Sequence, residues 1–290
     1  MQNSTQDVME LYLKDNTFSH EEYTVPQKLS NKVKWLRTGF DNPNIPTVYS
    51  HYNMLGVDKN AKGKKIGLLF ESRAIFPYEF EIERSIPNFD LVFTHNSEFL
   101  SKYYNTRWIP GGGIWVGGKV NPTLLGGSGG EIKIYPKTKN ISMVSSDKSM
   151  CELHVLRKRV ASLLSEDVDV YGTFGGKWVP IIDTLADYRF SIVMENFVDD
   201  KYFTEKLLNC FATGTVPIYL GARDLSEFNR DGIIECKSER DIYCQVFRIL
   251  QSPEHCYESM QYAIEDNFKL CQKYSMIEDY IYDNYREEII

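Results

Sequence analysis

The sequence predicts an α/β fold with two Rossmann-like domains and a helical C-terminal tail. Short apolar runs typical of buried strands alternate with amphipathic segments typical of helices. A glycine-rich stretch divides this alternation into two halves, and the last residues are mostly helical by pattern. We therefore expect domains at residues 1–125 and 126–255, followed by a tail at 256–290. A chain of 290 residues is long enough for two domains with cores of their own.

The first half alternates strands with short helices. Residues 8–15 are expected to form a short helix, and Asn96 or Ser97 to cap a later one. A second helix is expected at Phe80–Ile86, and the helix capped by Asn96 or Ser97 is expected at Ser97–Tyr104. The expected strands are Lys32–Leu36, Thr47–Tyr49, Lys65–Phe70 and Asp90–Thr94.

The glycine-rich stretch, residues 110–130, admits two interpretations. A phosphate-binding loop is one, but neither GxxxxGK[ST] nor a GxGxxG that opens a helix is present. A flexible connection between domains is the other, and we favour it. No dinucleotide fingerprint follows the first strong strand, Lys65–Phe70, which disfavours a dinucleotide-dependent oxidoreductase.

The second half is predicted to repeat the pattern. Ser149 and Glu152 match a capping box, and Arg157 lies beside the apolar face of the helix that follows. The expected helices are Met150–Leu164, Ile181–Ala186 and Glu239–Gln251. The expected strands are Asn140–Ser145, Val168–Tyr171, Phe190–Met194 and Val216–Leu220, with a strand end at Ile233–Glu235.

Charge, apolar runs and cysteines limit the classes of partner. The formal charge of −7 argues against broad, non-specific nucleic-acid binding, so no stable nucleic-acid partner is expected, although a local basic groove is compatible with that charge. No run approaches the roughly 18 apolar residues of a membrane helix. The N-terminus lacks the basic and apolar regions of a secretory signal. The six cysteines contain no CxxC pair, which favours reduced thiols in a cytoplasmic protein. The oligomeric state stays open.

Residues 188–221 are the most informative about function. They are predicted to form a strand, a polar loop, a helix and a second strand, in the length that a right-handed crossover requires. The polar residues gather where the first strand ends, which is the edge where open parallel sheets bind ligands. Thr204 can cap the helix and Gly214 can end it. The free N–H groups of its first turn favour a phosphate.

Five side chains near this edge have the chemistry of a nucleoside-diphosphate site. Lys206 is a point charge, and the planar fork of Arg157 could bridge two phosphates. Glu205 could accept two hydrogen bonds from a ribose diol, and Tyr202 and Asn196 could add contacts. Taken singly, each residue has an alternative interpretation. Glu205 and Lys206 could form a solvated helix start, and Arg157 could extend along an apolar face with its charge in water.

Two pairs of acids are not expected to bind a metal. Asp167 and Asp169 begin a strand, so they lie at the edge opposite the expected ligand. Asp199 and Asp200 lie in the polar loop and are expected to be solvated.

Residues 188–221 resemble the donor-binding motif of family 10 glycosyltransferases, the α-1,3/4-fucosyltransferases. That motif runs approximately F-x-[LI]-x-x-E-N-[ST], a variable loop, D/G-Y-x-T-E-K, a small-residue helix and G-x-[VI]-P-[IV]-x-x-G. The matching residues are Phe190, Glu195, Asn196, Tyr202, Thr204, Glu205, Lys206, Gly214, Val216, Pro217, Ile218 and Gly221. Upstream, Leu156-Arg157 resembles the family's arginine-bearing helix, and Phe70-Glu71-Ser72 resembles its E-S-P segment. The absent membrane anchor resembles bacterial or viral members.

The resemblance implies a GT-B fold of two facing Rossmann-like domains and an inverting transferase. Its substrates would be a nucleotide sugar, typically GDP-fucose, and a glycan hydroxyl, with no metal or other cofactor. Arg157 and Lys206 would neutralise the diphosphate and Glu205 would hold the ribose. The implied donor-binding residues are Arg157, Glu195, Asn196, Tyr202, Glu205 and Lys206.

Glu71 would be the general base that takes the proton of the acceptor hydroxyl. A loop acid paired with Arg73 is the alternative for Glu71, and Glu79, Glu98 and Glu195 are other candidate bases.

Two departures from the motif leave the substrates open: Phe197 replaces Ser or Thr, and Arg73 replaces proline. Another nucleotide sugar, or a non-glycan acceptor such as a modified nucleobase, therefore stays possible. A non-catalytic nucleotide-sugar-binding module is a further alternative.

Overall fold

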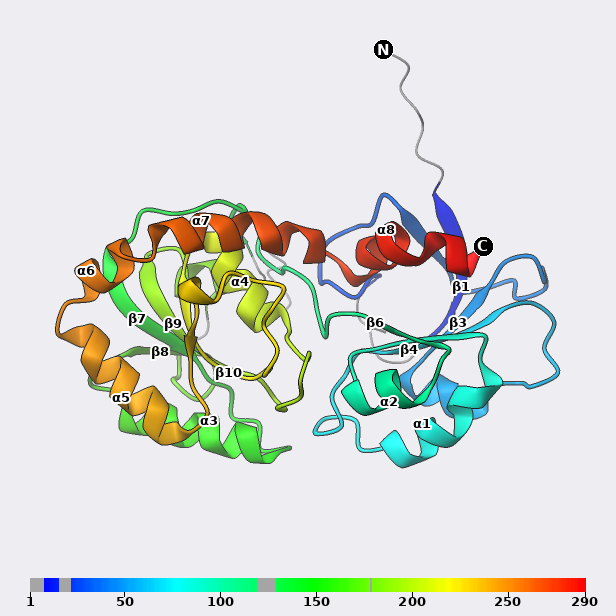
Figure 1. Ribbon diagram of the computed structural model, residues 1–290, viewed down its shortest axis with the longest axis horizontal. Coiled ribbons are helices and arrows are strands. Elements are labelled where there is room, and N and C mark those ends of the chain that lie inside the picture. The colour runs from blue at the N-terminus through cyan, green and yellow to red at the C-terminus, as the bar shows by residue number, and fades with distance from the viewer. Residues whose placement is uncertain (1–7, 16–21, 119–128, 178) are drawn as a thin grey trace, which may run out of the picture. The chain divides into compact units, whose positions relative to one another are not determined.

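The computed structural model describes residues 8–15, 22–118, 129–177 and 179–290. The chain forms two compact units, Met1–Gly113 with Tyr274–Ile290 and Ile114–Lys273. Each unit has its own sheet (Figure 1). The division falls in the glycine-rich stretch, at residue 113 where the sequence placed it at 125. Residues 119–128 of that stretch lie outside the described residues.

The first unit contains a sheet in the order β2-β1-β3-β4-β5-β6, and every neighbouring pair is parallel. The four strands predicted for this half are confirmed. The strands are β1 Met9–Lys14, β2 Val33–Leu36, β3 Thr47–Ser50, β4 Lys65–Leu69, β5 Leu91–Thr94 and β6 Thr106–Trp108.

Residues 8–15 contain a strand, and the short helix predicted for them is wrong. β1 pairs with β2 on one side and with β3 on the other. Leu11, Tyr12 and Leu13 are all buried, so both faces of the strand are covered. A central strand of a parallel sheet loses the alternation of apolar and polar residues that identifies a strand from sequence.

Short helices follow the strands of the first unit. As predicted, Asn96 caps the last of them, because its Oδ1 accepts a hydrogen bond from the Phe99 N–H at 3.0 Å. Ile82 and Phe99 bring two of these helices into one buried cluster with Met54. The helices are η1 His51–Gly56, α1 Glu79–Ser85, η2 Ile86–Asn88 and α2 Ser97–Lys102.

The C-terminal helix α8, Ile277–Ile289, belongs to the first unit. The buried Glu278 carboxylate accepts hydrogen bonds from the Thr24 N–H at 2.8 Å, the Thr24 hydroxyl at 2.6 Å and the Trp35 indole at 3.1 Å. The expected tail, 256–290, is therefore divided between the units. α6 Pro253–Glu258 and α7 Gln261–Leu270 belong to the second.

The second unit contains a sheet in the order β11-β10-β9-β7-β8, again with every neighbouring pair parallel. The predicted strands of this half are confirmed, and the helix predicted after β8 is the short 3-10 helix η3, Ile181–Thr184. The strands are β7 Lys139–Val144, β8 Asp169–Tyr171, β9 Tyr188–Met194, β10 Val216–Leu220 and β11 Ile234–Glu235.

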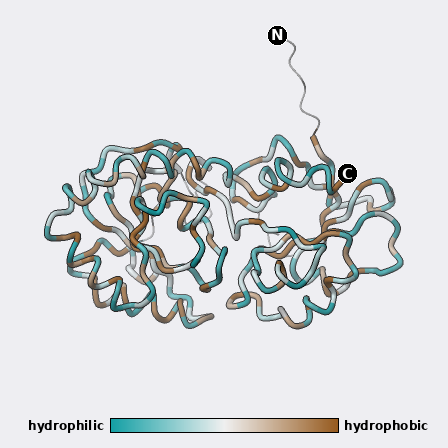
Figure 2. Tube along the Cα trace, in the orientation of Figure 1, coloured by the Kyte–Doolittle hydropathy of each residue, from teal (hydrophilic) through white to brown (hydrophobic). Residues whose placement is uncertain are grey.

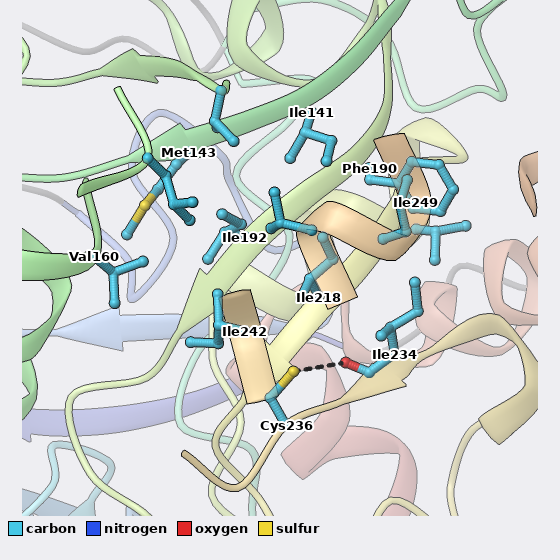
Figure 3. Packing of buried hydrophobic residues seen from close by; sticks show 14 of the residues in the cluster. Ile141, Met143, Val160, Phe190, Ile192, Ile218, Ile234, Cys236, Ile242 and Ile249 are labelled. Atoms are coloured by element: carbon cyan, nitrogen blue, oxygen red, sulfur yellow. Dashed lines mark hydrogen bonds between the residues drawn. The ribbon is translucent and has the colours of Figure 1, made fainter. Parts of the chain in front are cut away.

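Helices cover both faces of this second sheet (Figure 1). α3 Glu152–Leu163 and α5 Glu239–Leu250 lie on one face, where Val160 and Ile242 meet Ile192 of β9 in a buried cluster (Figure 3). α4 Glu205–Thr213 packs against β9 and β10 on the other face, and α7 packs on α4. Hydrophobic residues recur along the strands of both sheets (Figure 2).

The capping box predicted for α3 does not form. The helix begins at Glu152, with Cys151 at the cap position and no side-chain cap hydrogen bond. Ser149 accepts a hydrogen bond from the Lys158 ammonium instead. The helix starts two residues later than Met150, where the sequence placed it, so Ser149 lies too far upstream to cap it.

Within the described ranges, no helix is both long and apolar enough to cross a membrane. The six cysteines are free thiols, as the absence of a CxxC pair suggested.

Candidate functional site

A buried acid joins the end of β9 to the start of α4. Glu195 is fully buried, and its carboxylate accepts hydrogen bonds from the Thr204 N–H at 2.9 Å and from the Thr204 hydroxyl at 2.7 Å. Burial raises the pKa of Glu195, and the nearby Lys206 ammonium opposes that rise. Glu195 thus sets where the helix begins.

The close approach of Tyr219 and Glu195 explains the glycine that follows β10. A Cβ on Gly221 would lie 2.6 Å from Cγ of Glu195 and 2.4 Å from the Tyr219 hydroxyl. The glycine of the motif is therefore required by the close approach of both Tyr219 and Glu195.

The ends of α4 are as the sequence predicts. Thr204 occupies the N-cap, and its hydroxyl accepts from the Lys206 N–H at 3.4 Å. Gly214 ends the helix with a φ of 70°, a left-handed conformation that glycine adopts readily. Leu207 and Phe211 are buried on its inner face. The first turn of α4 is therefore fixed at the carboxyl edge of the sheet.

Lys206 and Glu205 form an ion pair in this first turn. The Lys206 ammonium lies 2.9 Å from the Glu205 carboxylate, 3.0 Å from the Thr204 hydroxyl and 3.5 Å from the Glu195 carboxylate. Burial alone would lower the pKa of Lys206, but the two carboxylates raise it above its usual value. Burial would likewise raise the pKa of Glu205, and Lys206 keeps it low. Both side chains are therefore charged.

Arg157 reaches the same edge from α3. It is 7% exposed, and one guanidinium nitrogen donates to the Met194 carbonyl at 2.5 Å and to Oδ1 of Asn196 at 3.0 Å. Burial lowers the pKa of Arg157, and Glu195 and Glu205 oppose that shift. An arginine keeps its charge even so, which places a second cation beside the end of β9.

His154 was not singled out from the sequence. Its Nε2 lies 3.0 Å from Oδ1 of Asn196, which also accepts from Arg157, so this nitrogen donates. Burial, followed by the charge of Arg157, lowers the pKa of His154. His154 precedes Arg157 by one helical turn, and this spacing is the signal that could have found it.

Three charged residues of the predicted site line one cavity of about 140 Å³ in the second unit. They are Arg157, Glu205 and Lys206. Asn209 of α4 also lines it, and its Oδ1 accepts from the Trp115 N–H at 2.9 Å. The remaining lining residues within the described ranges are Trp115, Val144, Ser146, Ile181, Thr184, Leu185, Ser191, Ile192, Val193, Met194 and Cys210.

The other predicted donor residues lie close by but do not line this cavity. Asn196 orients Arg157, and Glu195 holds the start of α4. The Tyr202 side chain is 1% exposed and is part of the packed interior.

Glu71 lies in the first unit, two residues after β4. Its N–H donates to Nε2 of His51 at 3.0 Å, and its carbonyl lies 3.2 Å from Nε2 of His95. Both histidines are buried, and the sequence did not single them out. His95 directly follows a predicted strand and His51 lies two residues after one, which is the signal that was available.

The other candidate bases differ in position. Glu98 is exposed in the first turn of α2, and Glu195 is buried in the second unit. The side chain of Glu79 lies outside the described part of the structure.

The acid pairs show no metal-binding geometry. Within the described residues, no group of three His, Cys, Asp or Glu side chains could hold a metal ion. Asp169 accepts a hydrogen bond from the Tyr188 hydroxyl at 2.5 Å. Asp200 is exposed and pairs with Arg223 at 3.3 Å. Asp199 is buried, contrary to the expectation that it is solvated, and its carboxylate accepts a hydrogen bond from the Asp200 N–H.

A known protein family matches part of the second unit. Residues 134–238 match the family model described as glycosyltransferase family 10 (fucosyltransferase) C-term. That segment includes β7 to β11 and the charged residues Arg157, Glu195, Glu205 and Lys206.

Curated relatives match shorter segments. The 4-galactosyl-N-acetylglucosaminide 3-alpha-L-fucosyltransferase 9 of Bos taurus is 37% identical over 60 residues, which are 20% of this chain and 17% of that protein. A fucosyltransferase-like protein of Arabidopsis thaliana is 27% identical over 118 residues, 38% of this chain and 23% of that protein. The chain thus spans less than a quarter of the length of these relatives.

Solved structures resemble the whole chain in fold. An alpha1,3-fucosyltransferase with GDP-fucose aligns with a TM-score of 0.55 at 13% identity, over 95% of this chain and 92% of the other. TarM aligns with a TM-score of 0.53 at 11% identity, over 84% of this chain and 54% of the other. The similarity supports the GT-B fold predicted from the sequence.

Proposed function

Because residues 134–238 match the model for the C-terminal domain of family 10 glycosyltransferases, we propose that this protein transfers L-fucose from GDP-fucose to a hydroxyl of a glycan, with inversion. The observation that carries the proposal is the convergence of Arg157, Lys206 and Glu205 on one cavity at the carboxyl edge of β9. Two fixed cations beside a helix N-terminus match the charge of a diphosphate.

The donor contacts follow from the position of each side chain. Arg157 and Lys206 bind the diphosphate and stabilise the charge that develops on it as it leaves. Glu205, next to Lys206, accepts hydrogen bonds from the ribose hydroxyls. Asn196 and His154 keep the Arg157 fork in place, and Glu195 keeps the first turn of α4 in place.

The chemical step needs one base and one leaving group. The acceptor hydroxyl gives its proton to the Glu71 carboxylate while its oxygen forms a bond to C1 of the fucosyl ring. The bond from C1 to the β-phosphate oxygen breaks, and its electron pair leaves with GDP. Attack on the face opposite the leaving group inverts the configuration at C1.

The binding half is tested with ligands alone. We expect GDP and GDP-fucose to raise the melting temperature more than UDP-glucose or GDP-mannose do, because ligand binding stabilises the native state. The Lys206→Met variant should lose this rise. Lys269→Met, which removes an exposed lysine on α7, should keep it. Equal stabilisation by UDP-glucose would overturn the assignment of the donor.

The catalytic half is tested by transfer to a panel of glycans, with the anomeric configuration of the product read by NMR. We expect transfer from GDP-fucose with inversion. Binding of GDP-fucose with no transfer to any acceptor would favour the non-catalytic binding module.

Two finer properties complete the proposal. Because Arg157 and Lys206 supply the positive charge, we expect EDTA to leave the transfer rate unchanged, and a rate restored only by Mn²⁺ would contradict this. We also propose a cytoplasmic location, supported by the six free thiols. Cell fractionation that finds the protein elsewhere would refute it.

A further inference from the structure

Three residues meet at the carboxyl edge of the first sheet. β3, β4 and β5 are neighbours in that sheet, and His51, Glu71 and His95 follow them within two residues. Parallel strands bring their carboxyl ends to one edge, which is where such sheets bind ligands. The two histidines are 1% and 2% exposed, so each is enclosed by the fold.

The two histidines hold opposite sides of Glu71. The Glu71 N–H donates to Nε2 of His51 at 3.0 Å, so this nitrogen is unprotonated. The Glu71 carbonyl can only accept, so Nε2 of His95, 3.2 Å away, donates to it. One peptide group on each side of the Glu71 Cα is therefore fixed, and together they fix the direction of its Cα–Cβ bond.

The backbone at His51 is strained. Its φ of 44° lies in the left-handed region, which costs a residue other than glycine on the order of 1–3 kcal/mol. The ring is held edge-on to Phe70, with centroids 4.5 Å apart, and to Phe76, with centroids 5.3 Å apart. Strain that the surrounding structure maintains is a feature of functional sites.

We propose that His51 and His95 are positioning residues for Glu71, which hold its carboxylate at the place where it takes the acceptor proton. The inference rests on the proposed function, in which Glu71 is the base. A base in a loop after a strand is effective only if its carboxylate is held within a fraction of an ångström of the reacting hydroxyl. Neither histidine touches a substrate in this role.

Paired substitutions separate hydrogen bonding from packing. Leucine at position 51 fills space but accepts no hydrogen bond, whereas the amide oxygen of glutamine can accept from the Glu71 N–H. We expect His51→Leu to lower kcat by about 10- to 100-fold with an unchanged KM for GDP-fucose. His51→Gln should recover most of the loss.

A second position guards against a folding defect at the strained residue. His95→Leu and His95→Gln repeat the comparison at a residue whose φ is not positive. We expect the same loss and the same recovery, because the glutamine amide can donate to the Glu71 carbonyl. Wild-type kcat in both leucine variants, with Glu71→Gln inactive, would overturn the inference and leave the proposed function intact. Equal losses in the leucine and glutamine variants would also overturn it.

If the wild-type protein transfers no fucose, the proposed function is refuted. The positioning of Glu71 by the two histidines can then still be tested by a measurement without substrate. The mobility of the ¹³C-labelled Glu71 side chain can be followed by NMR relaxation. We expect higher mobility in His51→Leu and His95→Leu than in wild type, with wild-type values in the glutamine variants. Unchanged mobility in the leucine variants would overturn the inference whatever the activity.

Discussion

The proposed donor site and the surroundings of the proposed base are built in different ways. In the second unit, functional side chains contact one another directly: Lys206 pairs with Glu205, and Arg157 donates a hydrogen bond to Asn196. In the first unit, the Glu71 backbone hydrogen-bonds to two buried histidines. The donor site is therefore organised by pairs of charges, whereas the Glu71 backbone is held by residues that follow two neighbouring strands.

The largest effect should come from the base itself. Glu71→Gln keeps the size of the side chain and removes its basicity, so we expect kcat to fall by about 100- to 10,000-fold. The affinity for GDP should stay the same, because the donor residues belong to the other unit. The measurement is initial transfer rate together with GDP binding by calorimetry.

Glu98→Gln is the matched control, since Glu98 is an exposed acid of the same unit. A variant at position 98 that is as slow as Glu71→Gln would move the base away from Glu71.

Removal of the buried Arg157 should mainly weaken the binding of the donor. Arg157→Met deletes a buried, hydrogen-bonded cation, which we expect to cost about 2–5 kcal/mol of donor binding, or about 30- to 4,000-fold in affinity. Titration calorimetry with GDP measures it. Arg159→Met, an exposed arginine on the same helix, should bind GDP as wild type does. If the two variants bind equally well, Arg157 has no part in the donor site.

The donor site could be predicted from sequence because its residues are close together in the chain. Glu195 to Lys206 lie in one strand-loop-helix segment, and Arg157 lies beside an apolar stripe of fixed period. The roles of Glu195 and Tyr202 could not be predicted, since only the packing shows which polar side chains are buried.

The surroundings of Glu71 were harder to predict. His51 and His95 come from other strands, and only the order β3-β4-β5 brings them to Glu71. β1 was missed for a related reason, because a strand covered on both faces has no alternating pattern to detect. The pairing of strands that are distant in the sequence determines both the surroundings of Glu71 and the strand β1. A local sequence pattern cannot predict such pairing.

Acid should weaken the first unit through His51. Burial, followed by the charge of His95, lowers the pKa of His51 from 6.5 to about 3. Below pH 6.5 the unfolded chain binds a proton that the folded chain does not, so stability is complete above pH 6.5 and is lost as the pH falls toward about 3. The slope is at most about 1.4 kcal/mol per pH unit.

Urea unfolding at several pH values between 7 and 4 measures this loss. His51→Gln has no titrating ring, so its stability should depend less on pH than that of wild type. Identical pH dependence in the two proteins would show that His51 is accessible to protons in the folded state.

The smallest effect should come from the cap that joins β9 to α4. Thr204→Val removes the hydroxyl that donates to Glu195 and accepts from Lys206. We expect a loss of about 1–2 kcal/mol in the free energy of unfolding, measured with urea, together with weaker GDP binding. Thr204→Ser keeps the hydroxyl and should behave as wild type. If valine weakens neither property, Glu195 holds the start of α4 through the Thr204 N–H alone, and the charge balance of the donor site does not depend on this cap.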